Sequence, residues 1–145
     1  MSWWNKIFTG DQDPRRVDYY HEGLELLNEG KHHEALTSFR LALKDAPGDP
    51  VVLQQIAIAY TRIGMTEEAA KTYRHVLKNQ PDAPGAHYGL AFLYLRGGQH
   101  VEAVRHLKAF LGNAPTGPDA AEHVEHARAT LAEITTDDAA AGEVS

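Results

Sequence analysis

Seven helical stretches, separated by short polar breaks that carry glycine or proline, account for the hydrophobic pattern of this chain. The last stretch shows the pattern most clearly, because Val124, Ala127, Leu131 and Ile134 follow one another at spacings of three, four and three residues, which places them on one side of a helix. Its other positions are mostly charged or histidine. Interruptions such as Ala46-Pro47-Gly48-Asp49 end the helices before it. The pattern predicts helices over residues 16–28, 32–45, 50–62, 66–79, 84–96, 100–112 and 118–134.

The same residues return at a fixed interval along most of the chain. Each member of four sets stands 34 residues after the one before it, and the sets are Gly30, Gly64 and Gly98, then Glu34, Glu68 and Glu102, then Ala35, Ala69 and Ala103, and finally Pro47, Pro81 and Pro115. A repeat of this length with small, aromatic and proline positions in a fixed order is typical of a helix-turn-helix solenoid. It divides the chain into units 16–49, 50–83 and 84–117. Such folds expose an extended surface, which favours binding over catalysis.

The order of residues inside each unit resembles the tetratricopeptide repeat. In the three units the matching residues are Tyr19, Glu22, Gly23, Leu26, Ala35, Phe39 and Pro47, then Leu53, Ile56, Ala57, Tyr60, Ala69, Tyr73 and Pro81, then His87, Leu90, Ala91, Tyr94, Ala103, Leu107 and Pro115. Glu22, Leu53 and His87 depart from the usual apolar or aromatic residue. The resemblance implies an all-α, right-handed α-solenoid of three repeats over residues 13–134, closed by a seventh, capping helix over residues 118–134.

Packing explains the small residues of the repeat. Gly23, Ala57 and Ala91 are expected where the two helices of a unit approach closely, and a larger side chain there would separate the helices at about 1–3 kcal/mol each. At the start of the helix over residues 66–79, Thr66 is expected to supply a capping side chain, with Glu67 and Glu68 complementing the helix dipole.

Composition narrows the functions that fit this fold. The 145 residues carry 14 Lys and Arg against 20 Asp and Glu, and no stretch combines clustered basic residues with interleaved aromatics, so we expect no nucleic-acid binding. The sequence has no cysteine, no phosphate-binding loop, no nucleophile elbow and no pair of carboxylates in a recognisable catalytic motif. We therefore expect no enzyme activity and no cofactor. No apolar run is long enough to span a membrane, and a cytoplasmic location is the default expectation.

A concave groove is implied by the family resemblance, because the first helix of each repeat lines it. The inward side chains, which are largely apolar and aromatic, are expected to be Val17, Tyr20, Leu24, Leu27, Gln54, Ile58, Thr61, Tyr88, Phe92 and Leu95. Leu27 and Leu95 are the two that a neighbouring helix could most easily cover instead. An apolar groove suits an amphipathic helix or an extended apolar segment of a partner protein.

Some tetratricopeptide repeats bind the C-terminal carboxylate of heat-shock chaperones through basic and amide side chains. None of the matching residues is basic, since they are Tyr20, Leu24, Gln55, Gly85 and Gly89. A bound carboxylate needs charge-assisted donors, so we do not expect a chaperone adaptor of that type.

Both tryptophans of the chain precede the repeats, in the aromatic N-terminal segment 1–12. Trp3, Trp4, Ile7 and Phe8 share one side if this segment is helical. Four roles remain open: covering the first repeat or the groove, docking on a partner protein, contacting a membrane interface, or no role. Docking on a second copy would make the protein a self-associating scaffold and a homo-oligomer, which is the alternative to the adaptor function.

Histidines and the C-terminal residues complete the sequence-based picture. His32 with His33, and His123 with His126, have spacings that two zinc ligands could use, but neither pair has an evident third ligand. We therefore predict no metal site, and His87, His100 and His106 have no assigned role. Residues 135–145 are small, acidic and aperiodic, which predicts a disordered acidic tail.

Overall fold

Helices are the only regular elements in the part of the chain that the structure describes. The computed structural model of the chain describes residues 18–144, with side chains for residues 18–138. Over that range there are seven helices and no strand: α2 (Tyr19–Asn28), α3 (His32–Asp45), α4 (Pro50–Ile63), α5 (Thr66–Asn79), α6 (Pro84–Arg96), α7 (His100–Gly112) and α8 (Pro118–Val144). The all-α prediction is confirmed. The bounds of α3, α5, α6 and α7 match those predicted, and α2 begins three residues later than residue 16, after Asp18.

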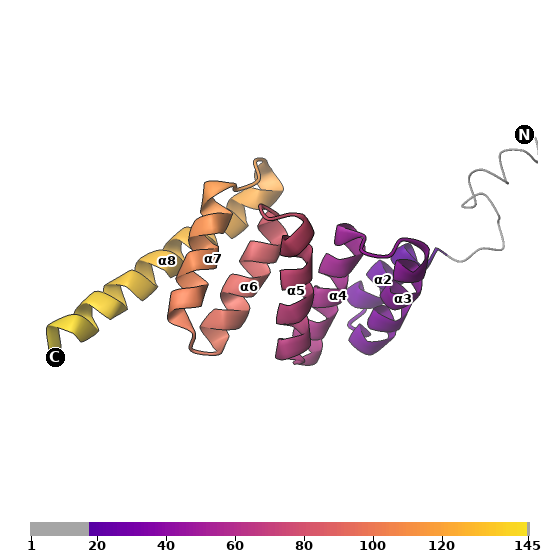
Figure 1. Ribbon diagram of the computed structural model, residues 1–145, viewed down its shortest axis with the longest axis horizontal. Helices are drawn as coiled ribbons and strands as arrows, with labels where there is room; N and C mark the ends of the chain where they lie inside the picture. The colour runs from indigo at the N-terminus through magenta and orange to yellow at the C-terminus, as the bar shows by residue number, and fades with distance from the viewer. Residues whose placement is uncertain (1–17, 145) are drawn as a thin grey trace, which may run out of the picture.

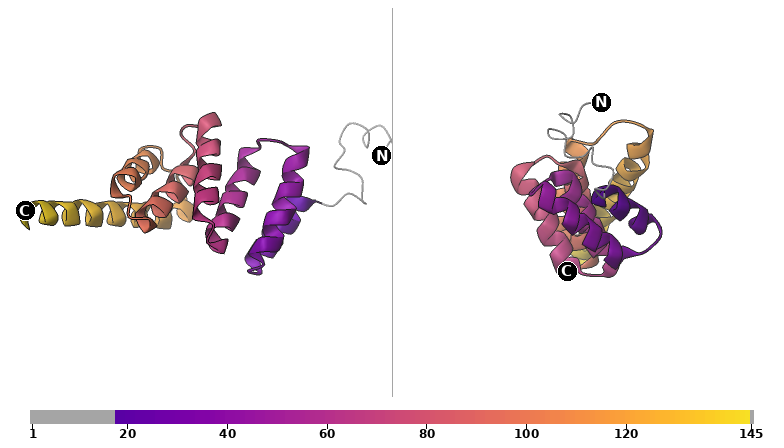
Figure 2. Two further views of the ribbon diagram at one scale, coloured as in Figure 1. Left: turned by 60° about the horizontal axis from the view of Figure 1, so that its bottom comes forward. Right: turned by 90° about the vertical axis from the view of Figure 1, so that its right-hand side faces the viewer.

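The helices pack as antiparallel pairs that stack along one direction (Figure 1). The pairs α2 with α3, α4 with α5 and α6 with α7 form the three units, and each second helix also contacts the first helix of the next unit. Figure 2 shows the resulting elongated array, with α2 at one end and α8 projecting from the other. This is the α-solenoid that the 34-residue repeat predicts.

Glycine makes the tight turn inside each unit possible. Gly30, Gly64 and Gly98 have φ angles of 81°, 93° and 76°, in the left-handed region that only glycine enters without steric cost.

Helix starts are capped where the sequence supplies an acid: the Asp18 carboxylate accepts a hydrogen bond from the His21 amide, and the Asp49 carboxylate accepts one from the Val51 amide. The prediction of a Thr66 cap is wrong. Met65 holds the cap position of α5, Thr66 is the first helical residue, and no side chain forms a capping hydrogen bond at this helix start.

Three hydrophobic clusters form the core: the first joins units one and two, the second joins units two and three, and the third joins unit three to α8. Ala35, Ala69 and Ala103 are fully buried where the paired helices touch. Gly23 explains the small residue of the first unit, because a Cβ built there would lie 2.5 Å from Cε1 of Phe39. Helix pairs therefore approach as closely as the repeat pattern predicts.

Helix α8 caps the last unit and then continues past it. Ala127 and Ile134 are buried in the third cluster, with Val124 and Leu131 partly buried beside them, as the helical stripe predicts. The helix runs on to Val144, so the predicted disorder of residues 135–144 is not what the structure shows. Residues 135–138 are exposed, and the extension follows from alanine-rich sequence without proline, because adding a residue to an existing helix costs far less than starting one.

Candidate binding groove

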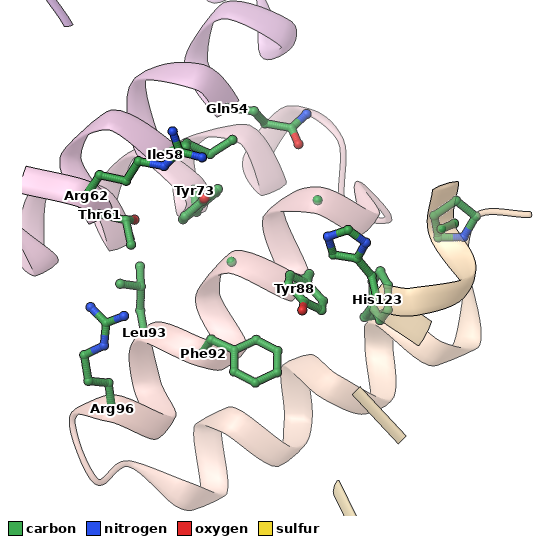
Figure 3. A pocket seen from close by; sticks show the side chains of 15 residues that line it. Gln54, Ile58, Thr61, Arg62, Tyr73, Tyr88, Phe92, Leu93, Arg96 and His123 are labelled. Carbon is green, nitrogen blue, oxygen red and sulfur yellow. The ribbon is translucent and has the colours of Figure 1, made fainter. Parts of the chain in front are cut away.

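One cavity of about 480 Å³ opens between the first helices of the second and third units. The elements that line it are α4, α6, the loop before α8 and the first turns of α8, with one side chain each from α5 and α7 (Figure 3). Its lining residues are Gln54, Ile58, Thr61, Arg62, Tyr73, Gly85, Tyr88, Gly89, Phe92, Leu93, Arg96, Phe110, Pro115, Ala120 and His123.

Apolar side chains from α4 and α6 face each other across the cavity. Ile58 and Phe92 are half-buried, and Leu93 is buried beneath them. Because these side chains keep part of their surface open to the cavity, an apolar side chain from a ligand could bury that surface, which is favourable at roughly 25 cal/mol per Å².

The cavity exists because α6 carries glycine where its neighbours approach. A Cβ at Gly89 would lie 2.3 Å from Cζ of Tyr73, and a Cβ at Gly85 would lie 2.2 Å from Oε1 of Gln54. These glycines therefore admit the Tyr73 ring and the Gln54 amide. They leave a recess in α6 where other residues would fill the space.

Tyr73 lies at the base of the cavity with 5% of its surface exposed. Burial raises the pKa of its phenol to about 12, against smaller opposing effects of a hydrogen bond with Thr61 and the charge of Arg62. The phenol is therefore protonated and neutral at any physiological pH, and it offers a hydroxyl rather than a charge to a ligand.

Two arginines stand at one end of the cavity, Arg62 at the end of α4 and Arg96 at the end of α6. Nη1 of Arg62 lies 3.4 Å from the Leu27 carbonyl oxygen, its only hydrogen bond within residues 18–138. Over the same residues neither guanidinium forms an ion pair with a carboxylate. Both keep donors free for an acceptor on a bound segment.

The other end of the cavity is built by aromatic contacts with α8. The Tyr88 ring centroid lies 5.1 Å from those of Phe110 and His123, and 4.8 Å from that of Phe92. His126 stacks on Phe92 at 4.9 Å with an angle of 15° between the rings. Burial, and then the charge of Glu122, raise the pKa of the Tyr88 phenol. The capping helix therefore also forms a wall of the groove.

The predicted groove residues separate into three groups. Gln54, Ile58, Thr61, Tyr88 and Phe92 line the cavity together. Leu27 is buried at 6% exposure, Tyr20 and Leu24 pack against the first cluster, and Leu95 packs against the third. Val17 and the aromatic residues Trp3, Trp4, Ile7 and Phe8 lie outside the described residues.

Several lining residues were not expected from the sequence. Tyr73 and Phe110 belong to second helices of their units, and Pro115, Ala120 and His123 come from the loop and helix that follow the last repeat. No local pattern points to them, since their place depends on how successive units are rotated. Arg62 and Arg96 could have been found, because both end a first helix and are spaced by one repeat.

Several histidines contact neighbouring aromatic rings or backbone groups. His87 and His106 pair through their Nδ1 atoms, 3.0 Å apart, and Nε2 of His87 donates to the Pro81 carbonyl oxygen at 2.7 Å. Within the described residues no group of three or more histidines and carboxylates is placed to hold a metal ion. Over the same residues, every helix is too short or too polar to cross a bilayer.

Comparison with known proteins identifies the repeat. Residues 55–118 match the tetratricopeptide repeat family. No curated protein sequence matches the chain. Among solved structures, Pseudomonas aeruginosa PcrH in complex with the chaperone-binding region of PopD is 18% identical, covers 83% of this chain and 90% of its own, and has a TM-score of 0.75.

Two further structures share the fold. Yersinia enterocolitica SycD, a type III secretion chaperone in complex with a peptide of the translocator YopD, is 16% identical, with 87% and 99% of the two chains covered and a TM-score of 0.77. The first tetratricopeptide repeat domain of Spaghetti (RPAP3), bound to an HSP90 peptide, is 18% identical, with 83% and 90% covered and a TM-score of 0.71. Residues 55–118 therefore match the tetratricopeptide repeat family, and the chain has the fold of tetratricopeptide repeat proteins.

Proposed function

We propose that this protein is a non-catalytic adaptor that binds a peptide or an amphipathic helix of a partner protein in the cavity between α4 and α6. The observation that carries the proposal is the cavity itself, an apolar recess formed by Ile58, Phe92 and the ring of Tyr73, with the Tyr73 hydroxyl at its base and two arginines at one end. Ligand sites in proteins have this character, apolar over most of their surface with a few polar groups that fix orientation.

Structures with the same fold support a peptide ligand. PcrH, SycD and the Spaghetti domain are each found in complex with a segment of another protein. The five positions that match the carboxylate-binding residues of some tetratricopeptide repeats carry no basic residue. A chaperone C-terminus of the kind bound by Spaghetti is therefore not the ligand we propose.

The groove chemistry describes the ligand further. An apolar side chain would occupy the space between Ile58 and Phe92, and a hydrogen-bond acceptor beside it would meet the free donors of Arg62 and Arg96. The proposed partner segment is therefore apolar in its centre. We place this activity in the cytoplasm, as expected from the sequence.

The test is selection of binding peptides by the full chain from a displayed random-peptide library, followed by affinity measurements on variants. Ile58→Gln places an amide in the cavity wall and should weaken the selected peptides by about tenfold, which corresponds to the apolar burial of one side chain. Val51→Gln is the matched control, because Val51 is a β-branched residue of the same helix that is 53% exposed outside the cavity. It should leave the affinity unchanged.

Two results would count against the adaptor function in this groove. If the chain selects no peptide, it is not a peptide-binding adaptor. If peptides are selected and Ile58→Gln weakens them no more than Val51→Gln does, the binding site lies elsewhere. The alternative of a self-associating scaffold depends on Trp3, Trp4, Ile7 and Phe8 and stays a prediction, which sedimentation of a chain without residues 1–12 would test.

A further inference from the structure

A second hollow, on the other side of α4 and α5 from the groove, gathers positive charge. It lies between α3, α4 and α5 and has a volume of about 620 Å³. Its lining includes four of the chain's 14 Lys and Arg residues, one histidine and none of its 20 Asp and Glu residues, namely Arg40, Lys71, Arg74, Lys78 and His75. The remaining lining residues are Leu43, Leu53, Ile56, Tyr60 and Thr72.

The hollow and the groove use different faces of the helices they share. On α4 the side chains that line the groove include Gln54, Ile58 and Thr61, whereas those that line the hollow are Leu53, Ile56 and Tyr60. At about 100° per residue these two sets point in nearly opposite directions. On α5 the groove takes Tyr73 alone, and the basic side chains lie on the opposite side. A ligand in one site therefore leaves the other open.

Two of the arginines are held in place by tyrosines of the following unit. Arg40 on α3 donates to the Tyr60 hydroxyl and lies 5.6 Å from the centre of that ring. Arg74 on α5 donates to the Tyr94 hydroxyl at 2.9 Å. Arg74 and Tyr94 stand one repeat after Arg40 and Tyr60, so the same contact recurs. Each contact holds a guanidinium at the joint between two units. A guanidinium has five N–H donors, so each arginine keeps donors for a ligand.

The basic side chains have no acidic partners in the fold. Within residues 18–138, none of Arg40, Lys71, Arg74 and Lys78 forms an ion pair with a carboxylate. The other 10 of the 14 Lys and Arg residues lie outside the lining of the hollow, as do all 20 Asp and Glu residues. A basic site therefore lies on an otherwise strongly acidic chain.

We propose that this hollow is a second docking site, and that its ligand is a short acidic segment of a partner protein with apolar residues among its carboxylates. The carboxylates would bind the four cationic side chains, and the apolar residues would cover half-buried Leu43 and Tyr60. A nucleic acid or an anionic membrane is a less suitable ligand, because either extends beyond the hollow over a chain whose other charges are mainly negative. The apolar floor also offers nothing to a phosphate backbone.

The experiment measures binding of labelled probes to the full chain by fluorescence anisotropy. The main probe is a synthetic peptide of about 12 residues that alternates pairs of glutamate with leucine, and its partner probe has glutamine at every glutamate. A single-stranded oligonucleotide and phosphatidylglycerol vesicles complete the set. We expect the glutamate peptide to bind, the glutamine peptide to bind about tenfold more weakly, and the affinity of the glutamate peptide to fall as salt is raised.

The variants locate the site without disturbing the arginine–tyrosine pairs. Lys71→Gln with Lys78→Gln should weaken the glutamate peptide by about fivefold or more, because two charge-assisted contacts are lost. Lys31→Gln with Lys108→Gln makes the same change in net charge away from the hollow and should alter the affinity less than twofold, as a long-range effect only. Both pairs are exposed, so circular dichroism should show the fold retained.

Four outcomes would overturn the proposal. One is no binding of the glutamate peptide. Another is equal weakening by the two lysine pairs, which would mean attraction to charge in general. A third is loss of glutamate-peptide binding in the Ile58→Gln variant but not in the variant with both Lys71→Gln and Lys78→Gln. That result would place the peptide in the groove. Tighter binding of the oligonucleotide or the vesicles, lost with the Lys71 and Lys78 substitutions, would assign the hollow to a phosphate surface.

Discussion

At the scale of single residues, Gly89 shows how one missing side chain creates a site. The Tyr73 ring from α5 occupies the space that a side chain at position 89 would need. Tyr73 is closely packed at 5% exposure, so its ring cannot move aside without disturbing the second cluster.

Gly89→Ala should therefore lower the free energy of unfolding by about 1–2 kcal/mol, although alanine is the better helix former. Gly112→Ala is the control, because nothing lies within 4 Å of the added Cβ and its φ is not in the left-handed region. Urea unfolding followed by circular dichroism measures both. A Gly89→Ala protein as stable as the Gly112→Ala protein would show that the Tyr73 ring has room to move.

His106 is expected to make the stability of the fold depend on pH. It pairs with His87 and stacks on Tyr94 at 5.5 Å, with Arg74, Arg105 and Glu102 also nearby. Burial first, and then the charge of His87, lower its pKa below the usual 6.5, while Glu102 acts in the opposite sense. In the unfolded chain the imidazole takes up its proton at a higher pH than in the fold. Its contribution to stability is thus present above about pH 6.5 and lost as the pH falls through the folded pKa.

We expect the melting temperature of the protein to fall between about pH 7.5 and pH 5.5, and to fall less in His106→Gln, which cannot take up that proton. His100→Gln serves as the control, because His100 is exposed at the start of α7. Differential scanning fluorimetry at both pH values is sufficient. The same pH dependence in all three proteins would assign the effect to other groups.

At the scale of elements, α8 has two parts with different roles. Its first part buries Ala127 and Ile134 against the last unit and places His123 and His126 on the groove aromatics. Beyond Ile134 the described side chains are exposed, and the Thr135 and Thr136 hydroxyls bond only to carbonyls of their own helix.

Ending the chain after residue 138 should change the free energy of unfolding by less than about 0.5 kcal/mol, because Ile134 is the last buried side chain of α8 among the described residues. Ile134→Ala should lower it by about 2–4 kcal/mol through the cavity that it leaves in the third cluster. Chemical unfolding of both proteins tests the division. A large loss on truncation would mean that residues 139–145 contribute to the fold.

At the scale of the whole molecule, stability is distributed along a line. Each unit contacts only the next, and only the second cluster, which includes Val76 and Leu90, has another cluster on both sides. In such an array the free energy of opening depends on the number of interfaces that must break.

Hydrogen exchange followed by mass spectrometry should consequently show the slowest amides in α5 and α6, faster exchange in α2, and the fastest in α8 beyond Ile134. Equal protection in every helix would indicate that the array opens only as one cooperative unit, contrary to this expectation.

The sequence by itself determined the repeat, the bounds of α3, α5, α6 and α7, and the small residues between paired helices. These features depend on neighbours within one unit, and the 34-residue period records them directly. It also indicated the half of the groove that comes from α4 and α6, because Ile58, Tyr88 and Phe92 lie on the first helices of their units.

Only the tertiary structure decided which side chains meet across units. The place of Tyr73, Phe110 and His123 in the groove, and the meeting of Arg40 with the lysines of α5 in the basic hollow, depend on the rotation of one helix pair against the next. Lys71, Arg74 and Lys78 follow one another on α5 at spacings of three and four residues, a stripe that the sequence already contains, whereas Arg40 lies on α3 and joins them only in the fold. The physical reason is the solenoid itself, since stacking places residues one repeat apart side by side in space.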